Sequence, residues 1–175
     1  MAGENILGEL RQALFSDPEF YAYAILDGAS IPTLQDRFYD DEPDYRCLFT
    51  GNLLPDVLSV APYVVKLEED DKFTDWVLEK SWGNHWGVFA ISPVDTRDMW
   101  NFLRTLLKVE DSDGNTLLFR FYDPRVMRTF LPTCDIDQLQ LMFGPIENYF
   151  LEGEDTELLL SFRLDESGLT SNMEQ

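Results

Sequence analysis

The chain has 175 residues, of which 45% are hydrophobic, and its 13 Lys and Arg residues stand against 33 Asp and Glu residues, for a formal net charge of -20. The apolar share excludes a disordered acidic chain, and the charge excludes binding of nucleic acid or an anionic membrane through bulk electrostatics. No apolar run approaches the ~20 residues of a membrane span, and the N-terminus has no signal-peptide core. Cys47 and Cys134 lie far apart, which is typical of a reducing compartment. We therefore expect a cytoplasmic protein.

The first half of the chain predicts helices and strands in alternation. Leu10 and Leu14 belong to the apolar face of a first helix, and Leu34 and Phe38 to that of a second. The expected elements, in chain order, are a helix at 5–15, a strand at 20–26, a short helix opened by Pro32, strands at 45–49 and 61–67, a helix after the acidic run 68–71, and a strand at 86–91.

The second half predicts three more helices, each with a start signal. Asp95 resembles an N-cap for a helix ending near residue 107, Asp123 precedes Pro124 at a helix start, and Asp135 with Gln138 forms a capping box. Residues 111–115 are expected to form a hairpin turn between strands at 107–110 and 116–122. Further strands are expected at 149–151 and 157–163.

This order of elements predicts an α/β fold: a single domain with a mixed β-sheet and helices packed on it. The domain is expected to cover residues 1–164. Residues 165–175 show no periodicity, so we expect a flexible C-terminal tail.

The sequence offers little catalytic chemistry. His85 is the one histidine, and we interpret it as a turn or surface residue, although a hydrolase would have to use it or a pair of carboxylates. No serine-elbow, phosphate-loop or dinucleotide-binding motif is present, and no Cys/His spacing fits zinc. We therefore expect no enzyme activity, no cofactor, no metal and no small-molecule substrate.

Residues 81–87 combine two tryptophans with two glycines, which is an unusual density of both residue types. Trp82, Gly83 and Trp86 lie close together in this segment. They indicate either interface anchors or a core turn that leads into a strand.

Residues 119–128 place three of the 13 basic residues, Arg120, Arg125 and Arg128, around Asp123. They form either a basic-aromatic patch for a partner, or an internal brace in which the arginines pair with Asp123, Asp27 or other acids. On the expected strand, Phe119 and Phe121 would share one face.

The order and spacing of several segments resemble one family. The segments are Leu26–Ala29, Tyr45–Gly51, Ala61–Val65, Trp82–Gly87, Phe119–Arg125 and Phe143–Pro145. Over residues 20–146 the chain resembles the effector chaperones, or adaptors, of bacterial type VI secretion systems, long known as a domain of unknown function. The matching motif positions are Asp27, Trp82, Gly83, Arg120, Asp123 and Arg125.

The resemblance implies a non-enzymatic protein that binds a toxin effector in the cytoplasm and loads it onto a VgrG-type spike. Two other hypotheses remain open. The charge alone would suit an acidic inhibitor, such as an immunity protein or a nucleic-acid mimic that binds one basic partner. The third is the hydrolase that uses His85 or a carboxylate pair.

Overall fold

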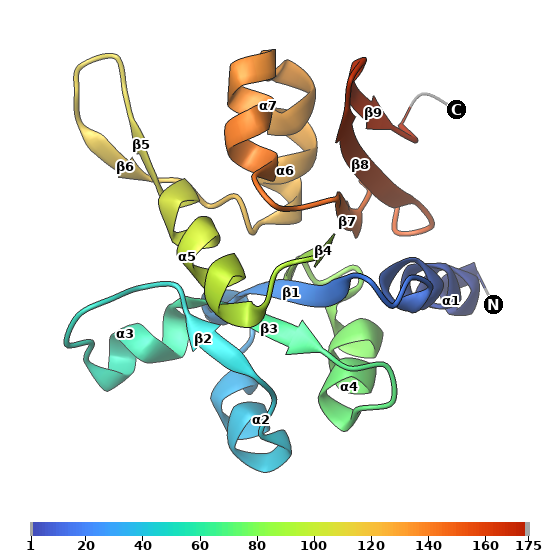
Figure 1. Ribbon diagram of the computed structural model, residues 1–175. Coiled ribbons are helices and arrows are strands. Elements are labelled where there is room, and N and C mark those ends of the chain that lie inside the picture. The colour runs from blue at the N-terminus through green and yellow to red at the C-terminus, as the bar shows by residue number, and fades with distance from the viewer. Residues whose placement is uncertain (1, 174–175) are drawn as a thin grey trace.

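The computed structural model describes residues 2–173, and within that range seven strands form one sheet in the order β2–β3–β1–β4–β7–β8–β9 (Figure 1). The strands are β1 (Tyr21–Asp27), β2 (Tyr45–Cys47), β3 (Pro62–Leu67), β4 (Gly87–Ser92), β7 (Asn148–Glu152), β8 (Leu159–Asp165) and β9 (Gly168–Ser171). A separate hairpin contains β5 (Lys108–Glu110) and β6 (Thr116–Leu118).

Helices cover both faces of this sheet. They are α1 (Ala2–Phe15), α2 (Leu34–Asp41), α3 (Pro55–Val60), α4 (Lys72–Ser81), α5 (Thr96–Leu106), α6 (Pro124–Phe130) and α7 (Ile136–Phe143). Short 3-10 turns occupy Gly28–Ser30 and Leu131–Thr133. Figure 1 shows α2 and α4 below the sheet, and α5, α6 and α7 above it.

Strand β1 explains why two layers of helices are needed. Its residues Ala22, Ala24 and Leu26 join a core cluster with α1, α2 and α4, whereas Tyr23 and Ile25 join the cluster with α5, α6 and α7. Successive side chains of a strand point to opposite faces, so an apolar run of this kind must be covered on both.

Aspartates begin four of the helices in the described part of the chain. The carboxylates of Asp71, Asp95, Asp123 and Asp135 each accept a hydrogen bond from an N–H of the first turn of α4, α5, α6 and α7. The predicted capping box at Asp135 and Gln138 is confirmed. Each such cap is worth ~1 kcal/mol to the helix it begins.

The α/β class and the single domain with helices packed on a sheet are confirmed. Every pairing in the seven-stranded sheet, within residues 2–173, is antiparallel, whereas the order of elements suggested a mixed sheet. Consecutive strands β7, β8 and β9 are joined by short connections, which favour antiparallel neighbours.

Three segments differ from the expectation. Helix α3 was not predicted, because none of its residues is buried and it therefore has no apolar stripe. Residues 119–122 do not continue the strand: 119 and 120 are irregular, and 121 and 122 lie in a turn that the hydrogen bond from Asp123 N to Arg120 O closes at 3.1 Å. Phe121 and Tyr122 are accordingly both buried although they are adjacent in sequence.

The expected tail 165–175 contains β9, which pairs with β8 through a turn closed by Asp165. The Asp165 carboxylate accepts hydrogen bonds from Ser167 N and Thr170 Oγ1, both at 2.7 Å. These hydrogen bonds from Ser167 and Thr170 lower the pKa of Asp165 to about 2. Residues 174 and 175 lie outside the described range. Within residues 2–173, every helix is too short or too polar to cross a lipid bilayer.

Candidate functional site

Three neighbouring strands bring most of the predicted site residues to one end of the sheet. Strand β1 ends at Asp27 beside the start of β4, where Leu26 pairs with Gly87. Strand β7 ends at Glu152 next to the same point, because Phe150 pairs with Phe89. We call the carboxylates of Asp27, Asp123 and Glu152, with the side chains bound to them, the carboxylate cluster.

Asp27 is buried, and both of its carboxylate oxygens accept hydrogen bonds. Its carboxylate accepts hydrogen bonds from Ala29 N at 3.1 Å, Ser30 Oγ at 3.0 Å and Arg120 Nη2 at 2.5 Å. The Asp27 side chain is 3% exposed, whereas that of Arg120 is 45% exposed. Burial lowers the pKa of Arg120, but the hydrogen bond to Asp27 outweighs it and raises the pKa overall. The Arg120 guanidinium thus stays charged across the ordinary pH range.

Asp123 performs two tasks at the start of α6. One oxygen accepts from Arg125 N at 2.9 Å, which caps the helix, and the guanidinium of Arg125 binds both oxygens at 3.0 and 2.8 Å. Burial alone would raise the pKa of Asp123, yet the hydrogen bonds from Arg125 lower it below its ordinary value. Arg120 also approaches Asp123, at 4.0 Å, and so links the two carboxylates.

Glu152 is the third buried carboxylate, and it holds the segment 81–87. It accepts from Gly83 N at 2.6 Å and pairs with His85 Nδ1. Arg128 reaches the same strand end, where Nη1 donates to Gly153 O at 3.1 Å. His85 lies in a turn, as interpreted from the sequence, and the structure adds its contact with Glu152.

Backbone conformation explains the two glycines of this segment. Gly83 has φ of +79°, a region that favours glycine, and His85 also has a positive φ, of 56°. A Cβ on Gly87 would lie 2.1 Å from Ile25 O, so only glycine allows β4 to approach β1 this closely.

Both tryptophans of the segment are half-buried. Trp82 Nε1 donates to Thr156 O at 2.7 Å, and the ring of Trp86 lies 5.0 Å from that of Trp76. Each ring therefore packs internally on one side and keeps accessible area on the other. Their role at an interface stays a prediction.

The structure gathers Asp27, Arg120, Asp123 and Arg125 into one network and connects Gly83 and Arg128 to it through the end of β7. The internal brace, one of the two alternatives for residues 119–128, is therefore present as geometry: Arg120 pairs with Asp27, and Arg125 with Asp123. Sequence reasoning missed Glu152. The only sequence signal is its place directly after the apolar run Tyr149–Leu151, and the structure shows that it is buried there.

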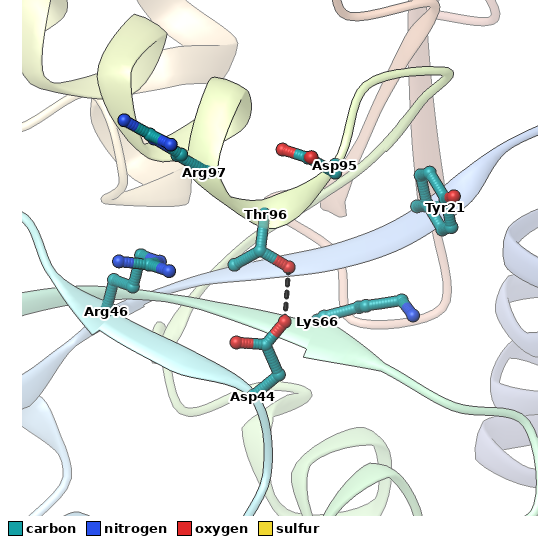
Figure 2. A pocket seen from close by; sticks show the side chains of 7 residues that line it. All are labelled: Tyr21, Asp44, Arg46, Lys66, Asp95, Thr96 and Arg97. Atoms are coloured by element: carbon teal, nitrogen blue, oxygen red, sulfur yellow. Dashed lines mark hydrogen bonds between the residues drawn. The ribbon is translucent and has the colours of Figure 1, made fainter.

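A polar pocket of about 240 Å³ lies at the opposite end of β1. Figure 2 shows Arg46 and Arg97 on one side of it and Tyr21 and Lys66 on the other. Thr96 Oγ1 donates to Asp44 Oδ2 at 2.5 Å between them. Asp95 completes its lining, so the pocket presents charges of both signs. Such a lining can hold charged groups of a partner.

Among the described residues, no group of three or more His, Cys, Asp or Glu is placed to hold a metal ion. No curated protein and no solved structure matches the chain. A family model described as a domain of unknown function, DUF4123, matches residues 22–141, which is more than half of the chain. That range contains Asp27, Arg120 and Asp123, whereas Glu152 lies beyond it. The chain therefore belongs to the DUF4123 family.

Proposed function

We propose that this protein is a non-enzymatic adaptor of a type VI secretion system, which binds a toxin effector in the cytoplasm and loads it onto a VgrG-type spike. Membership of the DUF4123 family and the resemblance of the motifs support this proposal. The single observation that carries it is the carboxylate cluster, where Arg120 and Arg125 of the motif Phe119–Arg125 are fixed at one surface.

The cluster suits protein binding because its cations are both held and accessible. Arg125 is 51% exposed, yet the carboxylate of Asp123 that positions it is 5% exposed. Arg125 uses Nε and Nη2 for Asp123, and Arg120 uses Nη2 for Asp27. A guanidinium has five N–H donors, so each arginine keeps donors for a carboxylate or carbonyl group of a partner.

Preorganisation is the physical advantage of this arrangement. Ordering a free arginine at an interface costs about 0.5–1.5 kcal/mol in side-chain entropy. The buried carboxylates have already ordered Arg120 and Arg125 before any partner arrives. Trp82 and Trp86 lie on the segment held by Glu152 and supply the aromatic area that interfaces favour.

Co-elution tests the adaptor role. The protein is passed through a size-exclusion column with the C-terminal part of the spike protein encoded beside its gene. The run is made with and without the toxin encoded there, at low and high salt. We expect a complex with the spike, or a ternary complex, that persists at high salt. Binding to the toxin alone that is lost as salt rises would instead favour the acidic inhibitor. An attraction that depends on the net charge of -20 is screened by salt.

Arg125→Glu tests the cluster itself. We expect weaker loading of the partner by a protein that is less stable but still folded. Asp123 loses its guanidinium partner, whereas its helix cap is kept because the cap uses the backbone N–H of residue 125. Arg163→Glu is the control, because Arg163 also forms a single ion pair but lies on β8 outside the cluster. Unchanged partner binding by a folded Arg125→Glu variant would remove the cluster from the interface. Loss of folding would assign Arg125 to the internal brace.

A further inference from the structure

The basic side chains of this acidic protein are not distributed evenly. Seven of the 13 form ion pairs with carboxylates in the described part of the chain. The other six have no carboxylate at ion-pair distance among residues 5–173, whose side chains the structure describes. Four of these six lie together on β2, α5 and β5: Arg46, Arg97, Arg104 and Lys108.

Trp100 lies at the centre of this group. Residues 97, 100 and 104 share one face of α5, because positions three and seven apart return to the same side of a helix. The guanidinium carbon of Arg104 lies 4.4 Å from the centre of the Trp100 ring, and that of Arg46 lies 5.8 Å from it. We call Arg46, Arg97, Trp100, Arg104 and Lys108 the basic stripe.

The basic stripe is held in place by the fold. Trp100 Nε1 donates to Cys47 O at 2.6 Å, which ties α5 to β2. Arg46 and Arg97 lie on the same side of the polar pocket (Figure 2). Arg104 and Lys108 line a second pocket, together with Leu48 and Phe49. The stripe is therefore a continuous surface rather than a set of scattered cations.

An apolar groove continues the stripe beyond Lys108. Its volume is about 330 Å³, and its lining includes Lys108, Val109, Phe119, Phe130 and Leu141. Leu141 is 70% exposed. A solvent-exposed leucine beside two phenylalanines offers apolar area that a partner can bury.

We propose that the basic stripe and the apolar groove together bind an acidic segment of a partner protein that also carries apolar side chains. Charge complementarity identifies the occupant. The molecule as a whole carries a net charge of -20 and repels acidic chains, whereas the four cations of the stripe form no ion pair with a carboxylate of residues 5–173. Arginine and tryptophan are also the residue types that contribute most at protein interfaces.

Two other occupants fit less well. Single-stranded nucleic acid uses arginines and a stacking tryptophan, but it would leave the apolar groove unused and its phosphates would meet the overall negative charge. A second copy of this chain would bring 33 acidic residues, but its own net charge of -20 opposes self-association. Asp44 and Asp95 border the stripe at its Arg97 end, so the partner carboxylates are expected between Arg46 and Lys108.

Binding of a labelled peptide tests the proposal without using the secretion proteins. The probes are a short fluorescein-labelled peptide of alternating Glu and Leu, the same peptide with Gln in place of Glu, and a short thymidine strand. Each is titrated by fluorescence anisotropy at moderate salt. The inference rests on the proposed adaptor role, for which it supplies a binding surface. The peptide titration uses no secretion protein, so the proposed function and this inference can fail independently.

The variant Arg97→Glu/Arg104→Glu reverses two cations of the stripe. The matched control is Lys72→Glu/Lys80→Glu, which makes the same change of charge on the exposed side of one other helix, α4. We expect the Glu-Leu peptide to bind the wild type and the control alike, and the stripe variant about tenfold more weakly. The Gln-Leu peptide is expected to bind the wild type weakly.

Several outcomes would overturn the proposal. They are an absence of Glu-Leu binding to the wild type, equal loss in both variants, and preferential binding of the thymidine strand through the stripe. A monomer-dimer equilibrium abolished by Arg97→Glu/Arg104→Glu alone would assign the stripe to a second copy. A thermal unfolding curve for each variant shows whether lost binding comes from lost folding.

Discussion

Arg120→Ala is expected to destabilise the fold strongly, although Arg120 is half-exposed. The reason is the asymmetry of its ion pair: the Arg120 side chain is 45% exposed and that of Asp27 is 3% exposed. Removing one partner of a buried pair costs about 3–5 kcal/mol, because the remaining charge is left buried. Asp27 would keep its hydrogen bonds from Ala29 N and Ser30 Oγ. We therefore expect a loss near the lower end, about 3 kcal/mol.

Urea unfolding and thermal unfolding measure this loss. For a domain of this length, 1 kcal/mol corresponds to roughly 2–4 °C in Tm, so Tm should fall by roughly 6–12 °C. Arg163→Ala is the matched control. It also breaks one Arg-carboxylate pair, but Arg163 is 56% and Glu147 33% exposed. An exposed pair is worth about 0–1 kcal/mol.

A double variant tests the cause. Asp27→Asn removes the buried charge and keeps an oxygen that can accept from Ala29 N, so Asp27→Asn/Arg120→Ala should be more stable than Arg120→Ala alone. The reasoning is refuted if Arg120→Ala costs no more than Arg163→Ala. It is equally refuted if Asp27→Asn restores no stability to the Arg120→Ala variant.

Three further outcomes follow from the contacts. The pKa of Asp123 is lowered in the folded state, so its contribution to the free energy of unfolding is complete above the ordinary carboxylate pKa of ~4 and is lost as pH falls below it. Asp123→Asn should therefore make the free energy of unfolding depend less on pH below ~4. An unchanged pH dependence in urea unfolding would count against this. Gly28→Ala should cost about 1–3 kcal/mol, because its Cβ would lie 2.3 Å from Ala61 O. Gly8→Ala, on α1, where the new methyl group would have no atom within 4 Å, should instead stabilise by roughly 0.5–1 kcal/mol, and thermal unfolding of the two variants should separate them in sign. Tyr149 is buried, which raises the pKa of its phenol. Tyr149→Phe should therefore leave the alkaline absorbance titration of the folded protein unchanged near the ordinary tyrosine pKa of ~10, and a smaller absorbance step there would contradict this.

Local signals made most elements predictable. The capping box at Asp135 and the aspartate before Pro124 fix helix starts through contacts a few residues apart, and sequence displays such contacts directly. Residues 119–122 were predicted as a strand because Phe, Arg, Phe and Tyr alternate. Tertiary packing overrides that pattern, since both Phe121 and Tyr122 enter the core beneath α5 and α6.

The candidate site was predictable only in part. The pairing of Arg120 with Asp27 was among the possibilities, because a charge at the end of a buried strand needs a partner. Glu152 was not anticipated, since its partners Gly83 and His85 precede it by more than sixty positions and no motif joins them. The sheet order, with β7 beside β4, creates that contact.

The position of β1 in the sheet makes its pairings long-range along the chain. β1 is synthesised before β3 and β4, the two strands with which it pairs. Its apolar residues therefore emerge from the ribosome before either neighbour exists, and such long-range pairings are slow to form. Segment 81–87 is held by a hydrogen bond to Glu152, so the carboxylate cluster is completed only when β7 has been synthesised. A nascent chain that stops before residue 152 would already hold the carboxylates that position Arg120 and Arg125, but would lack the strand end that binds Arg128 and Gly83.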